Sequence, residues 1–324
     1  MAANDFQPML AQSRDHGRTW ENHRPIWPQL AAEWSIFVSI SRSPDGRLML
    51  FGMRWPIDEP GESFWSDETQ GLKQNELVWS CSHDDGRSWQ PPRVVPIPVP
   101  GAAEAPAPLC VTSDERWLGC YSPYHTFDPE LSVDRSRVIV MASDDQGQTW
   151  KNSEMLRFSQ PRSGGAEAWV IQLSNGRLLG TGWHLHLDDQ QDYPNPYALS
   201  DDGLHWGPTR CTGIIGQSVG LAALPNGYAL MAYNQRKSPP IGVWLTLARP
   251  TDDDFGLLAN QIVWRAEVGT HDSDAADHSH WTNFRFGEPS VTVLDDGTLL
   301  VVFWVDQPDG RGVRFVRLRM KPDG

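Results

Sequence analysis

The stretch Ser143-Asp-Asp-Gln-Gly-Gln-Thr-Trp150 recurs almost unchanged along this chain. Nearly the same eight residues stand at 13–20 and 82–89, and a shortened copy stands at 200–206. In each copy the Asp can accept hydrogen bonds from the backbone of its own turn, the Gly permits a positive φ angle, and the final Trp can fold back as an apolar plug. The repeat therefore predicts a tight turn between two β-strands.

The spacing of the repeat indicates an array of similar units. Successive copies lie 69, 61 and 57 residues apart, counted between Asp15, Asp84, Asp145 and Asp202. This is the length of a four-stranded sheet with one long loop, and short apolar segments joined by Asp-Gly or Asn-Gly turns fill the intervals. For all-β units the usual closed arrangement is a propeller. We expect a single domain covering residues 1–324.

The N-terminal unit shows only its second half. Innermost strands are predicted at 35–40, 107–111, 168–173, 219–223 and 289–293. Ahead of them stand only a strand at 9–12, a copy of the repeat and one outer strand near Ile26. We therefore predict a six-bladed β-propeller of four-stranded antiparallel blades whose first blade is incomplete. A five-bladed ring closed by the N-terminal segment is the alternative.

The repeat also carries a family resemblance. Ser-x-Asp-x-Gly-x-Thr/Ser-Trp is the pattern of the Asp-box, or BNR repeat, and the chain resembles the sialidase superfamily over most of its length. The resemblance implies that the boxes lie on the propeller face away from the active site. Sialidases clamp a substrate carboxylate with three Arg and use an Asp as acid/base and a Tyr activated by a Glu. Their first Arg lies in a Phe/Tyr-Arg-Ile-Pro segment that this sequence lacks, so no catalytic residue carries over by motif.

Charge and hydropathy narrow the range of partners. The formal net charge is −14, which argues against nucleic acid or an anionic membrane as a partner. The longest strongly apolar run, 299–305, is too short to cross a bilayer, and the N-terminus shows no basic segment followed by an apolar one. As written, the chain is expected to be cytoplasmic. We expect a carbohydrate ligand and neither a metal nor a cofactor.

A Glu or Gln precedes every predicted innermost strand. The series reads Ala-Glu33-Trp, Ala-Glu104-Ala, Ala-Glu167-Ala, Gly-Gln217-Ser and Gly-Glu288-Pro. These side chains either bind backbone N–H groups at the mouth of the ring or converge on one pocket opposite the repeats. Converging carboxylates raise one another's pKa and supply the acid and the base or nucleophile that glycoside cleavage needs. The candidate catalytic residues are Glu104, Glu167, Glu288 and, as a nucleophile, Tyr233.

Loops on the same face carry polar and aromatic side chains suited to binding a sugar. An anionic sugar would need Arg, because the guanidinium group forms a bidentate fork to a carboxylate. The candidate substrate-binding residues are Arg54, Tyr124, His125, His184, Gln217, Asn234, Arg236, Trp281 and Arg285.

Three functions fit these observations. The preferred one is a sialidase-like exo-acting glycoside hydrolase on a carbohydrate, acidic or neutral, rather than a true sialidase. The alternatives are a polysaccharide lyase acting on a uronate-containing glycan, and a non-catalytic propeller that binds glycan or protein. Addition of water, an unsaturated product, or binding without turnover distinguishes them.

Overall fold

The computed structural model describes residues 3–269 and 284–320. Within these ranges the regular structure consists of β-strands and two 3₁₀ turns, η1 (Pro28–Leu30) and η2 (Pro225–Gly227). No helix in the described part of the chain is long and apolar enough to cross a membrane. The all-β prediction is therefore confirmed.

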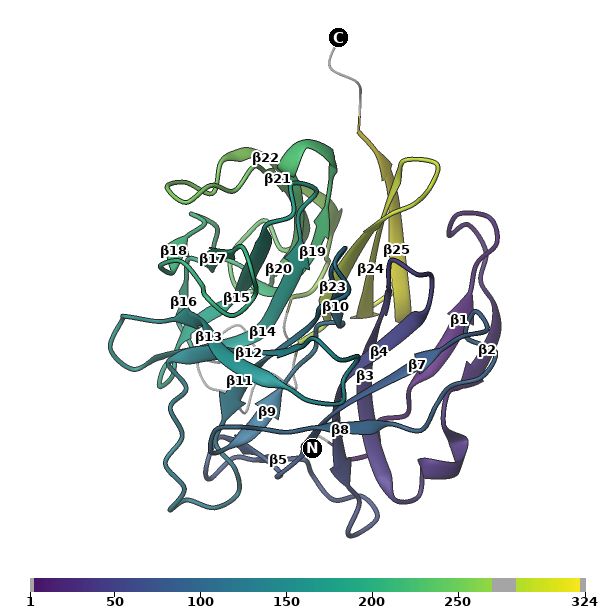
Figure 1. The fold of residues 1–324 in the computed structure, drawn as a ribbon, viewed down its shortest axis with the longest axis vertical. Helices are drawn as coiled ribbons and strands as arrows, with labels where there is room; N and C mark the ends of the chain where they lie inside the picture. Colours follow the sequence, from purple (N-terminus) through teal and green to yellow (C-terminus); the bar gives the residue numbers. More distant parts are fainter. Residues whose placement is uncertain (1–2, 270–283, 321–324) are drawn as a thin grey trace.

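Five antiparallel sheets follow one another in chain order around a ring (Figure 1). The first sheet contains β3 (Trp34–Arg42), β4 (Leu48–Pro56), β7 (Glu76–Ser82) and β8 (Arg93–Val95). The second contains β10 (Cys110–Val111), β11 (Trp117–Tyr124), β12 (Arg137–Ser143) and β13 (Lys151–Arg157), with β9 (Ala102–Glu104) also paired to β11. The third contains β14 (Ser163–Gln172), β15 (Leu178–His186), β17 (Pro196–Ser200) and β18 (Arg210–Cys211), with β16 (Asp192–Tyr193) beside β15.

The remaining sheets complete the circle. The fourth contains β19 (Gln217–Ala223), β20 (Ala229–Gln235), β21 (Gly242–Ala248) and β22 (Leu257–Arg265). The fifth contains β23 (Phe286–Val293), β24 (Thr298–Gln307) and β25 (Gly310–Arg319). A small hairpin, β5 (Trp65–Ser66) and β6 (Gly71–Leu72), lies in the long loop after β4. This arrangement is a β-propeller.

The N-terminal strands β1 (Met9–Gln12) and β2 (Glu21–Pro25) form a two-stranded sheet between the fifth and first sheets. On one side the Trp20 ring lies 6.2 Å from that of Phe315. On the other side Gln12 Nε2 donates to the carbonyl of Asp85 at 3.0 Å. The ring therefore has five main sheets, as in the alternative prediction, and the β1–β2 sheet occupies the place of an incomplete sixth blade.

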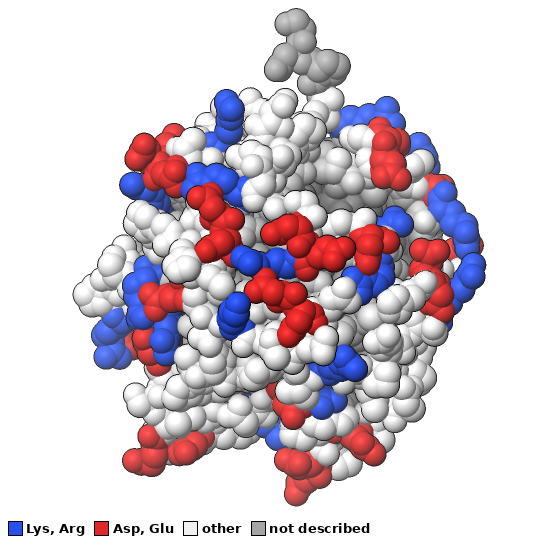
Figure 2. Space-filling view, viewed as in Figure 1, with Lys and Arg blue, Asp and Glu red and all other residues white. Residues whose placement is uncertain are grey.

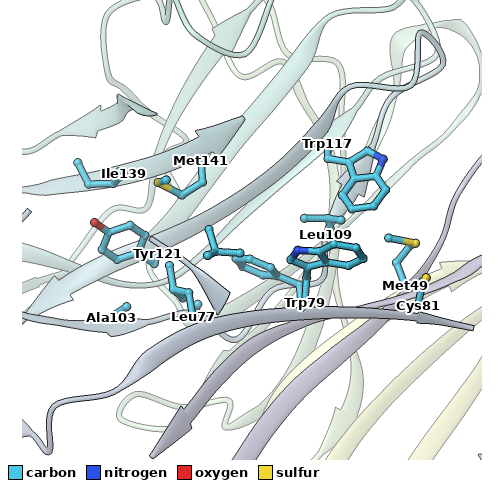
Figure 3. Close-up of a cluster of buried hydrophobic side chains, with 13 residues drawn as sticks. Met49, Leu77, Trp79, Cys81, Ala103, Leu109, Trp117, Tyr121, Ile139 and Met141 are labelled. Atoms are coloured by element: carbon cyan, nitrogen blue, oxygen red, sulfur yellow. The ribbon is translucent and has the colours of Figure 1, made fainter. Parts of the chain in front are cut away.

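Neighbouring sheets are held together by large apolar side chains. Figure 3 shows Trp79 of the first sheet packed against Trp117 of the second, with ring centres 4.8 Å apart. Both side chains are almost completely buried, and each contributes roughly 1.5–3 kcal/mol through removal of apolar surface from water. A Cβ on Gly119 would lie 2.5 Å from the Phe51 ring, so this position requires glycine. The blades thus pack as a continuous core around the ring.

The copies of the repeat fold alike. In the copy that begins at Ser143, the hydroxyl of that residue accepts the N–H of Gly147 at 2.8 Å, and Asp145 accepts the N–H and hydroxyl of Thr149 at 2.8 and 2.6 Å. The hydroxyl and N–H of Thr149 lower the pKa of Asp145 to about 2. The equivalent bonds recur around Asp15 and Asp84. These bonds stabilise each turn through its own side chains.

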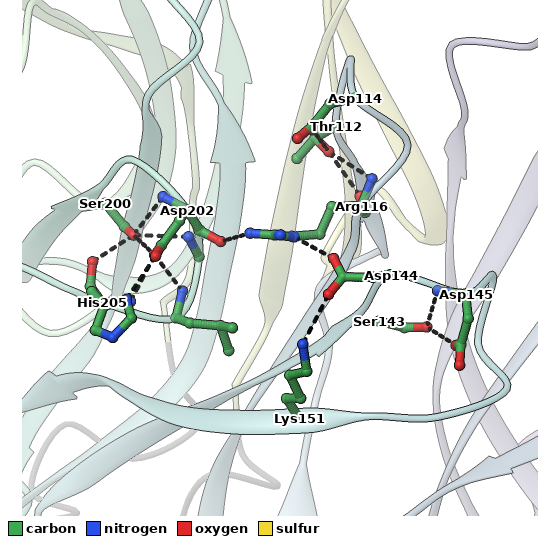
Figure 4. Close-up of polar contacts among 12 residues, drawn as sticks. Thr112, Asp114, Arg116, Ser143, Asp144, Asp145, Lys151, Ser200, Asp202 and His205 are labelled. Atoms are coloured by element: carbon green, nitrogen blue, oxygen red, sulfur yellow. Dashed lines mark hydrogen bonds and ion pairs between the residues drawn. The ribbon is translucent and has the colours of Figure 1, made fainter.

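Polar contacts also join one turn to the next. Figure 4 shows Arg116 between two copies, with its Nε donating to Asp144 Oδ1 at 2.7 Å and its Nη1 donating to the carbonyl of Asp202. On the face shown in Figure 2, acidic and basic side chains are interspersed, so the net negative charge does not produce a uniformly acidic surface there.

The strand register separates the two ends of the propeller. Leu48, Trp117 and Leu178 begin their strands opposite the first residues of three repeat copies. The second strands β4, β11 and β15 therefore start at the face that carries the repeats and end at the opposite face. Loops that follow these strands gather at the second face, together with the starts of the innermost strands.

Candidate functional site

A cavity of about 260 Å³ lies at the face opposite the repeats. Three carboxylates line it, Glu104, Glu167 and Glu288, together with the guanidinium of Arg236. A second cavity of about 280 Å³ runs between the innermost strands, and Glu167 and Glu288 line this one as well. These three carboxylates therefore lie where the central channel meets the outer cavity. The other two members of the predicted series, Glu33 and Gln217, line neither cavity.

Backbone strain directs two of these side chains inward. Glu167 and Glu288 have φ angles of 50° and 49°, and Ser218 at the corresponding place in the fourth sheet has 40°. The pairing of each innermost strand with its neighbour is interrupted at the same place. Positive φ is unfavourable for residues other than glycine, and bulges of this kind re-aim side chains next to active sites. Three successive sheets thus bear the same local distortion around one channel.

Glu104 is positioned differently. Of the innermost strand expected at 107–111, only residues 110–111 (β10) form a strand, and a separate short strand, β9, precedes them, so the prediction of one continuous strand there is wrong. Pro106 and Pro108 lie in the gap, and proline cannot donate a ladder hydrogen bond. Glu104 ends β9, and its Oε2 accepts the backbone N–H of Glu167 at 2.7 Å. One candidate carboxylate is therefore bonded directly to the backbone of another.

Burial sets the protonation of the three carboxyl groups. It raises the pKa of Glu104 to about 8, and repulsion from Glu167 and Glu288 adds to this rise. Loss of hydration also raises the pKa of Glu288, to about 7, with a smaller contribution from Glu167, although Glu288 is an exposed residue where it lines the two cavities. Burial also raises the pKa of Glu167, but Arg236 and hydrogen bonds from Ser218 oppose the rise. Glu104 therefore holds its proton to a higher pH than Glu288, and Arg236 and Ser218 are the groups that favour the anion of Glu167.

Arg236 is held from several directions. Its guanidinium carbon lies 3.7 Å from the centre of the Phe284 ring, and its Nη atoms donate to the carbonyl of Phe286 and the hydroxyl of Ser218, each at 3.3 Å. Its backbone N–H donates to Gln217 Oε1 at 2.9 Å. Burial lowers the pKa of Arg236 to about 10, against the pull of the neighbouring carboxylates. The side chain is still a cation at neutral pH.

Comparison with solved structures shows which fold this is. No family model and no curated protein sequence matches the chain. A protein of unknown function from Dyadobacter fermentans superimposes with a TM-score of 0.70 at 19% identity, covering 97% of this chain and 84% of that one. The NanB sialidase from Streptococcus pneumoniae gives 0.59 at 14% identity, covering 96% of this chain and 63% of that one. The chain has a sialidase-like fold.

A further neighbour with this fold acts on a different sugar. The GH93 α-L-arabinofuranosidase of Fusarium graminearum, solved with arabinobiose, gives a TM-score of 0.61 at 14% identity, covering 96% of this chain and 84% of that one. The present chain spans less than two thirds of the length of the NanB sialidase. At such low identities the similarity establishes the sialidase-like fold alone.

Three predicted residues lie apart from the carboxylates of this sialidase-like propeller. The Tyr233 ring stacks on Trp244 at 6.2 Å, and its hydroxyl accepts the amide N–H of Asn260 at 3.0 Å, so it packs between sheets. Arg54 donates to Glu76 at 2.7 Å. Arg285 donates to Asp306 at 2.7 Å. None of the three lines the cavity.

The remaining predicted residues divide between the cavity wall and its surroundings. Tyr124 lines the cavity, whereas the buried His184 ring lies between Phe158 and Tyr193, 4.6 and 4.8 Å away. Burial lowers the pKa of His184 to about 4, so it is neutral. His125 is half-buried beside the cavity residues, Gln217 and Asn234 are fully buried behind them, and Trp281 lies outside the described residues.

The predicted site residues omit two features of the cavity and its surroundings. Arg135 is not among the predicted site residues, yet its guanidinium lies 3.7 Å from the centre of the Tyr124 ring and is almost fully buried. An aromatic cluster of Phe6, Trp55 and Phe64, with ring centres 5.3–6.2 Å apart, forms one side of the cavity. Among the described residues, no group of three His, Cys, Asp or Glu side chains is arranged to hold a metal ion.

Proposed function

We propose that this chain is a glycoside hydrolase that removes a terminal sugar from a carbohydrate bound in the cavity opposite the repeats. The observation that carries the proposal is the convergence of Glu104, Glu167 and Glu288 on one cavity, where burial raises the pKa of all three and Arg236 and Ser218 oppose the rise at Glu167. Hydrolysis of a glycosidic bond needs one protonated and one ionised carboxyl group beside the bond. The sialidase-like fold, shared with a sialidase and an arabinofuranosidase, supports the same reaction class.

The environments suggest a role for each group. Glu104 holds its proton at neutral pH and would donate it to the departing glycosidic oxygen. Glu167, whose anion Arg236 and Ser218 favour, would in its ionised form either attack the anomeric carbon or remove a proton from the attacking water. Glu288 would add negative charge opposite the oxocarbenium-like transition state when ionised.

The size of the cavity supports cleavage at the end of a chain. A volume of about 260 Å³ is slightly below the range of roughly 300–1,000 Å³ common for ligand pockets, which suits one or two sugar rings. We further propose that the four repeat turns are Asp-boxes. Their side chains satisfy their own turns on the other face of the propeller, so they would contribute to stability and not to the reaction.

Product analysis after incubation with a mixed oligosaccharide panel tests the proposal. We expect products heavier by one water with the wild-type chain, loss of turnover with Glu104→Gln and with Glu167→Gln, and full turnover with Glu33→Gln. Glu33 is the matched control because it precedes an innermost strand in the same way but is exposed and outside the cavity. An unsaturated uronate would indicate a lyase instead, and binding without turnover would indicate a binding propeller.

A further inference from the structure

We infer that the sugar accepted by this cavity is uncharged and presents a hydroxyl-poor face, as a pentose or a 6-deoxyhexose does, and that acidic sugars are rejected. The inference rests on the proposed function, because it takes the cavity to be the place where the sugar binds. Three independent features support it: the chemistry of the wall, the state of its cations, and the charge of its acidic side chains.

The wall is mostly aromatic. Phe6, Trp55 and Phe64 form one continuous cluster, with ring centres 5.3, 5.4 and 6.2 Å apart. Trp65 lies next to Tyr124, with ring centres 6.5 Å apart, on the same cavity. The faces of aromatic rings are complementary to the C–H face of a sugar ring and offer its hydroxyl groups no conventional hydrogen bond, so that only ring edges such as the Trp N–H and Tyr O–H groups can pair with them. A sugar with many exocyclic hydroxyls would leave several of them unpaired here.

The cation of the cavity is already in use. The two Nη atoms of Arg236 donate to Phe286 and Ser218, one face of its guanidinium covers Phe284, and the nearby carboxylates of Glu167 and Glu288 balance its charge. A bidentate clamp on a substrate carboxylate would need both Nη atoms, or one of them with Nε, to be directed at the ligand. Both Nη atoms of Arg236 therefore have structural partners, whereas its buried Nε has none among the described residues.

Other nearby cations are also committed. Arg54 pairs with Glu76 at 2.6 Å, Arg285 pairs with Asp306 at 2.7 Å, and Lys237 pairs with Asp192 at 2.8 Å. Neither Arg54 nor Arg285 nor Lys237 lines the cavity. The buried Arg135 is not a lining residue. Its guanidinium covers the Tyr124 ring, whereas its Nε and Nη2 atoms have no hydrogen-bond partner among the described residues.

The acidic side chains oppose an anionic ligand. Glu104, Glu167 and Glu288 all face the same small volume, with one guanidinium among them. A carboxylate brought into this volume would lose its hydration and meet at least one ionised carboxylate at short range, which is unfavourable in a poorly solvated site. A neutral sugar brings no such cost, and its few hydroxyls can donate to the carboxylate oxygens.

Saturation-transfer NMR on the full wild-type chain tests the inference directly. Xylose, arabinose, fucose and rhamnose serve as neutral probes, and glucuronic acid and N-acetylneuraminic acid serve as acidic ones. We expect saturation of the C–H protons of at least one neutral sugar on irradiation of the aromatic protons, with an affinity on the order of 100-fold above that of either acid. Trp55→Ala should weaken this binding, and Glu33→Gln should leave it unchanged.

Turnover of the 4-nitrophenyl glycosides of the same sugars separates the two proposals. Binding of neutral sugars without any turnover would overturn the hydrolase proposal and leave the inference standing. Equal or tighter binding of an acidic sugar would overturn the inference, whether or not that sugar is cleaved. Failure of every probe to bind would overturn it too. A further check is Glu288→Gln, which should strengthen the binding of glucuronic acid because it removes one opposing carboxyl group.

Discussion

Replacing Glu104 by Gln should make the protein more stable at alkaline pH while abolishing its activity. The pKa of Glu104 rises from its ordinary value of 4.5 to about 8, mainly through burial. Between these two pH values the folded chain keeps a proton that the unfolded chain has released, so the free energy of unfolding falls as the pH rises across this window. Above pH 8, this rise in pKa lowers the free energy of unfolding by at most about 5 kcal/mol, at roughly 1.4 kcal/mol per pKa unit. Because neighbouring carboxyl groups share in the proton binding, we expect the free energy of unfolding to fall by about 2–5 kcal/mol across this pH range.

Glutamine at position 104 has no proton to release, so it removes this pH-dependent loss of stability while it keeps the local hydrogen bond. Its side-chain oxygen can still accept the N–H of Glu167, the bond that Glu104 Oε2 makes at 2.7 Å. Urea unfolding at pH 5 and pH 8.5 measures the effect. The variant should match the wild type within about 1 kcal/mol at the lower pH and exceed it at the higher one, whereas Glu33→Gln should match the wild type at both. Equal pH dependence in the wild type and in Glu104→Gln would refute the assignment of Glu104 as a buried, proton-holding acid.

Other perturbations test the site and the scaffold separately. The activity of the wild type should fall as the pH rises through about 8, since Glu104 then loses the proton it donates; a rate that rises through this range would contradict its role as the acid. Arg236→Met should shift the acidic limb of the pH–rate profile of any residual activity to higher pH, because the charge that opposes protonation of Glu167 is gone; an unchanged limb would argue against their coupling. Trp150→Ala in a repeat turn should lower the free energy of unfolding by about 2 kcal/mol, because a half-buried ring packed on the core is lost, with the kcat of the folded fraction unchanged. A loss of kcat in that variant would show that the repeat face influences the reaction.

The fold could be predicted from local chemistry. Each repeat turn is stabilised by its own residues, as the bonds between Asp145 and Thr149 illustrate, and its sequence signature is correspondingly complete. The series of Glu residues before the innermost strands also located the centre of the cavity. Strands of a propeller converge at the axis, which brings Glu104, Glu167 and Glu288 together, whereas Glu33 is exposed outside the cavity and Gln217 is buried behind it.

The parts that sequence reasoning missed depend on long-range contacts or on local irregularity. Tyr233 follows the strand alternation of β20 into the layer between sheets, and no sequence signal distinguished that side from the channel. Phe6 reaches the cavity because the N-terminal segment bonds to β3, where the backbone N–H of Ile36 donates to its carbonyl at 2.9 Å. The break between β9 and β10 was signalled by Pro106 and Pro108, which the prediction of one continuous strand at 107–111 did not take into account.

Cleavage of an oligosaccharide in water labelled with heavy oxygen tests the central claim most directly. The account predicts that the label appears in the released sugar with the wild-type chain and with Glu33→Gln, and that neither Glu104→Gln nor Glu167→Gln releases sugar although both remain folded. An unlabelled, unsaturated product would contradict hydrolysis. Undiminished labelling with both cavity variants would contradict the assignment of the reaction to these carboxyl groups.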